Sequence, residues 1–416
     1  MKFKIMQLIK ASGPGIITGA ADDDPSGIGT YTVAGAQFGT AFLWTAVVTW
    51  PLMAVVQMAC ARIGMVTGQG LGSALKNKFP KWVVIIFGSA LFFANTLNVG
   101  ADLSAMADSA EMLTGGSSHF FVVLFATGIT LATVHLSYTK ISQVLKWLAI
   151  SLFSYIATAL ILSPDWKSIF LSTIHPHWPQ SSKEWATLVA ILGTTISPYL
   201  FFWQASLEVE EEKALGLKTV AQRRGATEED LFFRKFDVGI GTFFSNLVMY
   251  FVILAAALTL NKNGLTNIET SKQAAEALVP IAGKFASLLY TLGILGVGLL
   301  AIPTLTGSAA YALAETFNWS QGLDLKLKKA KLFYAVVFVS TLIAVIFDFI
   351  KLNPIKALYW SAVINGLLAP FLLIGILYVL CDSKLMRDQA GTLRSKIGIA
   401  ITTLLMIAAA LGMFLA

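Results

Sequence analysis

The sequence predicts an all-α integral membrane protein with eleven transmembrane helices, of which the first and the sixth are broken. Hydrophobic residues make up 56% of the 416 residues and charged residues only 13%, with a mean hydropathy of +0.72. This composition is typical of a chain whose main solvent is lipid. Eleven apolar segments of transmembrane length recur along the chain, and proline interrupts two of them beside polar residues.

The apolar segments, taken in chain order with about 20 residues for each crossing, leave little chain between them. They cover residues 11–36, 41–66, 82–108, 119–138, 142–163, 186–209, 237–260, 281–312, 331–350, 355–380 and 397–415. The longest polar connections are too short to form a packed domain. We therefore expect one membrane domain over residues 1–416. It comprises a first five-helix repeat (1–163), a second repeat (186–380) and an extra helix (397–415).

Basic residues are distributed unevenly between the two sets of connections. If the first segment begins in the cytoplasm, the connections on that side and their edges carry 23 of the 30 Lys and Arg residues. The positive-inside rule then predicts a cytoplasmic amino terminus in the cell (inner) membrane, and the odd number of spans predicts an external carboxyl terminus. The net charge of +7 therefore needs no nucleic-acid partner. The lipid bilayer is the expected surroundings, and no obligatory protein partner is evident.

The first segment contains three consecutive acids, Asp22, Asp23 and Asp24, and a charge at the bilayer centre costs at least ~2.5–3.5 kcal/mol on insertion scales. The following Pro25 and Gly27 are expected to interrupt the helix. Successive helical residues point about 100° apart, so we expect one direct ligand, Asp24, at the break. Asp23, a further candidate ligand, and Asp22 are expected in an aqueous vestibule or hydrogen-bonded to waters of the ion.

The sixth segment is interrupted by Pro198 within GTTISPYLFF, residues 193–202. Segments one and six open the two five-helix halves, and paired broken helices at corresponding positions indicate a transporter site at the membrane midplane. Unwound backbone is tolerated where it lines a cavity, and its carbonyls can bind a cation. A lone proline is more often a simple kink, but two matched breaks, one beside three acids, favour a site.

Five motifs are spread along the chain: GPGIITGAADDDPSG, then AGAQFGTAFLWTAVVTWPLMAVVQMACARIGMVTGQGL, GADLSAM, LGTTISPY and LVPIAGKFASLLYTLGILGVGL. Together they resemble the Nramp family of divalent-metal transporters. The family's first helix carries Asp-Pro-Gly-Asn, and its second ends in a similar Gly-x-Val-Thr-Gly. The resemblance spans most of the chain and implies a leucine-transporter-type 5+5 inverted repeat with alternating access around one ion site. The metal ion is then the transported substrate, and no cofactor is implied.

The departures from the family pattern concern the ligands. Asp24 matches the family's Asp, but Gly27 stands where the family has Asn. In segment six, Thr194 and Ser197 stand where the family uses an Ala carbonyl and a Met thioether. Thioether sulfur selects transition metals, whereas oxygen ligands suit Mg²⁺, Ca²⁺ or Mn²⁺, and Mg²⁺ usually keeps several waters. The pattern resembles the Nramp-related magnesium transporter branch, which implies that Mg²⁺, and Mn²⁺, move as partly hydrated ions.

Proton coupling depends on other positions. Family members that move protons use an acidic pair in segment three and histidines on segment six. Here Asp102 matches one acid and Ala105 replaces the other, while Tyr199 and Gln204 replace the histidines. No group that titrates near neutral pH remains at the matched histidine positions, so we expect transport without strict proton coupling. The alternative is a proton-coupled Mn²⁺/Fe²⁺ transporter of the ordinary family type, in which Asp102 alone carries the proton.

Other polar residues within the apolar segments are weaker candidates. Gln57 and Asn246, on the second and seventh helices, are candidates for contact with the hydrated ion, whereas Asn98 is assigned to interhelical hydrogen bonding. Glu208 begins an acidic run at the end of segment six. We expect that run to be solvated, although it could also draw cations toward the inner vestibule.

Two other classes of function compete with metal transport. A carrier of a small organic cation or amino acid could use the aspartates to hold an amine or a coupling Na⁺, but the first break lacks aromatic residues. An intramembrane enzyme is disfavoured because the sequence contains neither a His-Glu-x-x-His motif nor a nucleophile elbow. We therefore expect a transporter that is not an enzyme.

Overall fold

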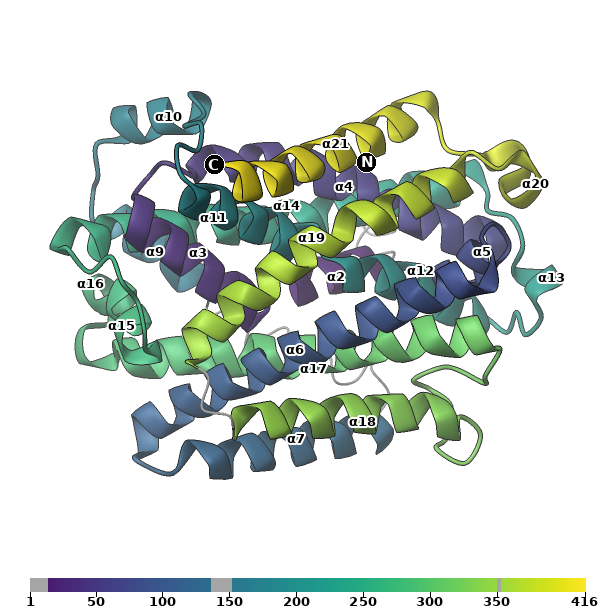
Figure 1. The fold of residues 1–416 in the computed structure, drawn as a ribbon, viewed down its shortest axis with the longest axis horizontal. Coiled ribbons are helices and arrows are strands. Elements are labelled where there is room, and N and C mark those ends of the chain that lie inside the picture. The colour runs from purple at the N-terminus through teal and green to yellow at the C-terminus, as the bar shows by residue number, and fades with distance from the viewer. Residues whose placement is uncertain (1–13, 136–151, 350–352) are drawn as a thin grey trace, which may run out of the picture.

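The computed structural model describes residues 14–135, 152–349 and 353–416, and within them the chain forms helices and no strand. Long helices run along the longest axis of the molecule, and short helices lie at its two ends (Figure 1). Helices α5, α13 and α20 lie at one end, and α10, α15 and α16 lie at the other. The former is called the basic end below, because the Lys and Arg residues of 62–81, 213–235, 326–331 and 384–396 belong to it.

The helices follow one another without any intervening sheet. In the first half they are α2 (Pro14–Asp22), α3 (Pro25–Phe38), α4 (Leu43–Thr67), α5 (Leu71–Lys76), α6 (Lys81–Thr114), α7 (Ser118–His135), α9 (Phe153–Ile161), α10 (Trp166–Ile174), α11 (Ser182–Thr195) and α12 (Pro198–Ala214). In the second half they are α13 (Val220–Arg223), α14 (Glu228–Thr259), α15 (Ser271–Ala275), α16 (Val279–Ala282), α17 (Ala286–Phe317), α18 (Lys331–Asp348), α19 (Pro354–Leu380), α20 (Ser383–Met386) and α21 (Leu393–Leu415). Single 3₁₀ turns are η2 (Asn261–Asn263), η3 (Glu276–Leu278), η4 (Gly283–Phe285) and η5 (Arg387–Gln389).

Both predicted helix breaks are confirmed. The first span divides into α2 and α3 at Asp23 and Asp24, and the sixth divides into α11 and α12 at Ile196 and Ser197. Nine helical stretches within the described ranges are long and apolar enough to cross a membrane. The divided first span adds a further pass, and α9 is the described part of the predicted segment 142–163, of which residues 142–151 lie outside the described ranges.

Two helix starts differ from the predicted segments. Helix α14 begins at Glu228, well before residue 237, because Thr227 and Asp230 form a capping box within the polar connection. Helix α17 begins at Ala286 rather than near residue 281. The chain before it turns at Gly283, whose φ of +50° lies in the left-handed region that favours glycine.

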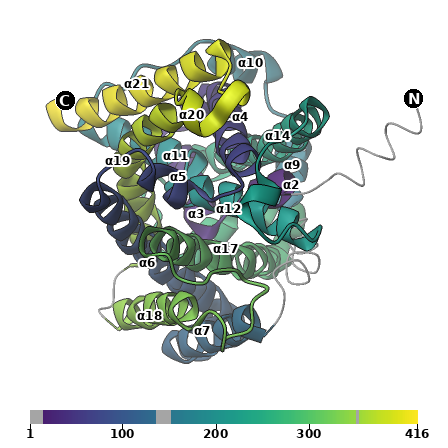
Figure 2. The ribbon, with the colours of Figure 1, turned by 90° about the vertical axis from the view of Figure 1, so that its right-hand side faces the viewer.

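The two broken helices lie at the centre of the molecule. Figure 2 shows α3 and α12 surrounded by the longer helices, with α7 and α18 outermost on one side and α21 outermost on the other. Helix α2 packs along α14 at very short range, since a methyl group added at Gly19 would collide with the Gly241 backbone. Small residues allow this close approach of membrane helices. The packing holds the end of α2, and therefore the first break, against the middle of α14.

Candidate metal site

Asp24 occupies the first break as the N-cap of α3. Its backbone is extended, with φ −72° and ψ 168°, and its Oδ1 accepts a 2.6 Å hydrogen bond from the Gly27 amide. Pro25 follows at the first helical position, where proline is favoured. The Oδ2 atom accepts a 2.8 Å hydrogen bond from Asn98 Nδ2, and the residue is 1% exposed. An ionised carboxylate has about four acceptor positions, so these bonds leave room for an ion.

Asn98 connects Asp24 to α19. The hydroxyl of Ser361 donates to Asn98 Oδ1 at 2.7 Å, and the hydroxyls of Ser26 and Ser361 lie 3.1 Å apart. The sequence analysis assigned Asn98 to interhelical hydrogen bonding but did not identify Asp24 as its partner. A usable signal was present, because Asn98 and Asp102 are four residues apart and residues so spaced share a helix face.

Asp102 lies close to the same carboxylate. It is fully buried beside Asp24 and the Ser26 backbone. No side chain of the described residues donates a hydrogen bond to either of its carboxylate oxygens. The structure thus brings Asp102 of α6 next to Asp24 and places an acid from another helix beside the first break.

The second break lies opposite the first. A Cβ atom added at Gly27 would lie 3.2 Å from Thr194 Oγ1 and 3.4 Å from Asp24 Oδ1, so these three residues meet. The Ser197 hydroxyl instead donates to the carbonyl of Thr194 at 2.5 Å and to that of Gly193 at 2.8 Å. The Ser197 side chain is therefore bonded to the backbone of the last turn of α11, and it is the Thr194 hydroxyl that faces Asp24 and Gly27.

Tyrosine side chains link the two breaks directly. The Tyr199 hydroxyl donates a 2.9 Å hydrogen bond to the carbonyl of Ala21, in the last turn of α2. The hydroxyls of Tyr31 and Thr195 lie 3.3 Å apart. Tyr199 thus occupies a structural position between the half-helices, and it holds one of the carbonyls that the end of α2 exposes.

Asp22 and Asp23 are more enclosed than the sequence analysis expected. They are 0% and 6% exposed, so neither lies in an aqueous vestibule in this structure. The hydroxyl of Ser245 donates to Asp22 Oδ2 at 2.5 Å and lies 3.3 Å from Asp23 Oδ1. The close packing of α2 on α14 explains the difference, because it places both acids against α14.

Asn246 and Gln57, the two candidates for contact with the hydrated ion, differ in their hydrogen bonding. Asn246 Oδ1 accepts a 2.6 Å hydrogen bond from Thr49, and its Nδ2 donates to the Thr242 carbonyl at 2.9 Å. Its side chain therefore bonds to α4 and to its own helix, while the preceding Ser245 contacts the acids. Gln57 is 1% exposed, and neither of its amide atoms has a hydrogen-bond partner among the described residues.

Glu208 is not part of a solvated acidic end. It is 1% exposed, and its Oε1 lies 2.9 Å from Arg234 Nε and 2.7 Å from Gln204 Nε2. The sequence analysis did not foresee this burial, because the cation that makes it tolerable lies on another helix, α14. Glu208 therefore belongs to a buried ion-pair network at the basic end.

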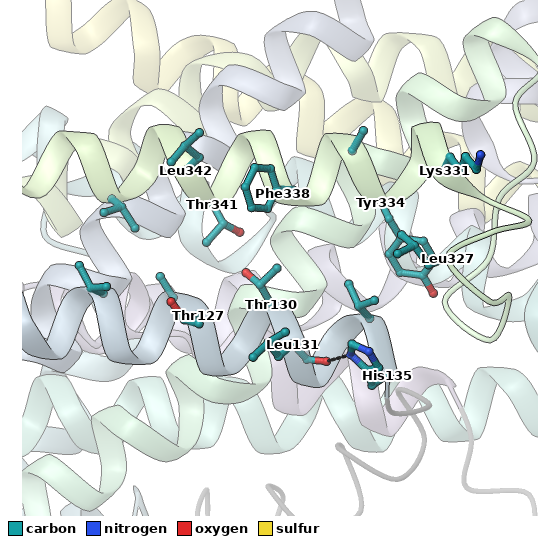
Figure 3. Close-up of a pocket in the computed structure, with 15 residues that line it drawn as sticks. Thr127, Thr130, Leu131, His135, Leu327, Lys331, Tyr334, Phe338, Thr341 and Leu342 are labelled. Carbon is teal, nitrogen blue, oxygen red and sulfur yellow. Dashed lines mark hydrogen bonds between the residues drawn. The ribbon is translucent and has the colours of Figure 1, made fainter.

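A groove between α7 and α18 lies apart from these acids (Figure 3). Its volume is about 590 Å³, and apolar and threonine side chains line most of it, with Lys331 and His135 at one end. None of the described residues that line it is acidic. The groove therefore does not have the ligand chemistry of a cation site, in contrast to the buried acids at the breaks.

A sequence profile described as natural resistance-associated macrophage protein-like (Nramp) matches residues 15–416. This chain belongs to the Nramp family. The divalent metal cation transporter MntH of Caldanaerobacter subterraneus subsp. tengcongensis is 25% identical over 99% of this chain and 94% of its own length. The MntH of Yersinia pestis is 26% identical over 72% of this chain and 70% of its own length.

Solved structures share the fold of this Nramp protein. A crystal structure of the Eremococcus coleocola manganese transporter matches with a TM-score of 0.77 and 18% identity, covering 97% of this chain and 85% of that one. Mhp1, a nucleobase-cation-symport-1 family transporter, matches with a TM-score of 0.55 and 14% identity over 96% of this chain and 92% of its own. The predicted fold class is confirmed, and the chain is a multi-pass membrane protein.

Proposed function

We propose that this protein transports divalent metal cations, with Mg²⁺ carried as a partly hydrated ion and Mn²⁺ as a second substrate, without strict proton coupling. The observation that carries the proposal is the position of Asp24, whose buried carboxylate lies at one helix break and faces Thr194 at the other. The names of the MntH relatives support the class of substrate. Mg²⁺ uptake into liposomes that contain the purified protein tests the proposal.

The surroundings of Asp24 favour a hard cation. Asp22, Asp23 and Asp102 are close enough to interact electrostatically with Asp24 or with one another, and all four acids are buried. Buried carboxylates are costly unless they are paired, protonated or bound to a metal. The nearby hydroxyl and amide oxygens are ligands that suit Mg²⁺ and Mn²⁺. A dication with several waters would offset the mutual repulsion of these acids.

We expect metal influx to leave the pH inside the liposomes unchanged. Ala105, Tyr199 and Gln204 provide no acid or imidazole at positions where proton-moving family members carry them, and Tyr199 is bonded to the α2 backbone instead. The measurement is a trapped pH indicator together with a metal indicator, under an inward Mg²⁺ gradient. Acidification in a fixed ratio to the metal taken up would contradict this expectation.

Asp102 favours one alternative, a transporter that moves a proton with Mn²⁺ or Fe²⁺. A buried acid without a side-chain donor, next to the ion ligand, could exchange a proton as the ion binds. Asp102→Asn separates the two mechanisms. If metal moves alone, an imposed pH gradient should change metal uptake neither in the wild type nor in the Asp102→Asn variant. If wild-type uptake is driven by the gradient and Asp102→Asn abolishes that drive, the alternative is correct.

The ligand set should determine which metal is preferred. We expect the double variant Ser197→Met, Gly27→Asn to gain Mn²⁺ or Cd²⁺ affinity and to lose Mg²⁺ transport, because a thioether and an amide oxygen would replace water around the ion. The Cβ atom introduced at Gly27 must displace Thr194 Oγ1 slightly, since it would lie 3.2 Å away. Calorimetric titration of both metals is the measurement, with Gly27→Ala, which adds the Cβ atom without the amide oxygen, as the control for crowding. Unchanged relative affinities would contradict ligation by oxygen around a hydrated ion.

A further inference from the structure

A second groove lies at the basic end of the bundle. It has a volume of about 960 Å³ and is lined by residues of α4, α14 and α21. Trp50, Met58 and Phe232 supply apolar lining, and Trp50 and Phe232 are 41% and 65% exposed. An apolar, open groove between membrane helices is expected to be covered by lipid or by another apolar group.

Three cations line the same groove. They are Arg62 of α4, Lys235 of α14 and Arg394 of α21, and one acid, Glu228, accompanies them. Lys235 and Arg394 are exposed, while Arg62 is partly buried and its Nη1 donates to the Gln389 carbonyl at 3.3 Å. Three different helices therefore bring positive charge together beside apolar walls. Such an arrangement fits an anion that carries an apolar tail.

The dimensions of the groove fit one leaflet of a bilayer. Trp50 and Arg62 are twelve residues apart on α4, which corresponds to about 18 Å along the helix. Half of the hydrocarbon core is about 15 Å thick. Arg62 lies near the end of α4, whereas Arg394 lies in the first turn of α21, so the charges lie at the basic end and the apolar walls extend toward the bilayer centre.

We propose that this groove binds one anionic glycerophospholipid, with its phosphate among Arg62, Lys235 and Arg394 and an acyl chain along Trp50 and Met58. Basic pockets between transmembrane helices are suited to such head groups. The lipid would connect α21 and α4 to α14, which packs against both halves of the broken first helix. This site is separate from the proposed ion site and does not depend on which metal is transported.

The test is retention of phosphatidylglycerol by the full-length protein in detergent, measured by native mass spectrometry against phosphatidylcholine. The wild type should retain one phosphatidylglycerol at concentrations where phosphatidylcholine is lost. The variant Lys235→Gln, Arg394→Gln should retain it about 30-fold more weakly, equivalent to about 2 kcal/mol. Both side chains are exposed, so the variant should fold normally. Equal retention of the two lipids by the wild type would overturn the proposal.

Two further variants make the test specific. Lys183→Gln, Lys356→Gln removes the same charge from a groove of about 660 Å³ at the opposite end, and it should retain phosphatidylglycerol as the wild type does. Ala54→Phe fills the apolar part of the proposed site and leaves its cations intact, so it should lose the lipid. Equal losses in the Lys183 variant, or full retention in the Ala54 variant, would overturn the assignment of a lipid to this groove.

Discussion

Replacing Asp24 by Ala should reduce Mg²⁺ and Mn²⁺ flux by more than about 100-fold, which corresponds to at least about 2.7 kcal/mol. The reason is electrostatic, because neutral oxygens alone do not hold a dication in a buried, poorly solvated site. The carboxylate is 1% exposed and faces the second break. Flux into liposomes that contain equal amounts of folded protein is the measurement. Near-normal flux would place the ion elsewhere.

The structural role of Asp24 requires a matched control. Its Oδ1 caps α3, and loss of an N-cap costs about 1 kcal/mol, so Asp24→Ala could weaken the fold as well as the site. Asp24→Asn retains a good capping side chain and removes the charge. We expect Asp24→Asn to unfold at nearly the wild-type temperature and yet transport no metal. Thr392→Ala, which removes the cap of α21, should lower stability similarly and retain transport.

The sequence predicted the fold and the breaks because their causes are local. Pro25 and Pro198 interrupt apolar segments, and each stands at the first position of a helix in the structure. Segment length and hydropathy then fix the number of crossings. The position of Asp24 at the break follows from the same local chemistry, as an aspartate before proline is a strong N-cap.

The site's partners could not be predicted in the same way, because they depend on packing between distant helices. Asn98 and Ser245 contact the acids, although sequence patterns alone favoured Gln57 and Asn246. Choosing between Ser245 and Asn246 requires knowing the rotation of α14 about its axis. That rotation is set by glycine contacts such as Gly19 with Gly241, and a single sequence does not reveal which glycines meet.

Glu208 belongs to an ion-pair network at the basic end that joins three helices, α2, α12 and α14. Arg234 of α14 pairs with Glu208 and Glu211 of α12 and with Asp237, whose Oδ2 lies 2.7 Å from Arg234 Nη1. The same Asp237 oxygen accepts a 2.7 Å hydrogen bond from the Gly15 amide of α2. The network therefore joins α2 and α12, one half of each broken helix, to α14.

Removing the cation should release α2. Arg234→Gln removes the cation that pairs with two buried carboxylates, Glu208 and Asp237, a change that typically costs about 3–5 kcal/mol, and separating α2 from α14 would admit water and relieve that cost. We expect Thr18→Cys, on a buried position of α2, to react with a thiol reagent at least about tenfold faster when Arg234→Gln is added. The background carries Cys381→Ser, since Cys381 is exposed and Cys60 is buried.

The matched control is another basic residue at the same end. Lys213 lies 2.8 Å from Glu210, but its side chain is 31% exposed, and exposed ion pairs contribute about 0–1 kcal/mol. Lys213→Gln should therefore leave the reaction rate of Thr18→Cys unchanged. If Arg234→Gln also leaves that rate unchanged while the protein stays folded, the Arg234 network does not hold α2 closed. Opening of the basic end must then be limited by the helix packing between α2 and α14 itself.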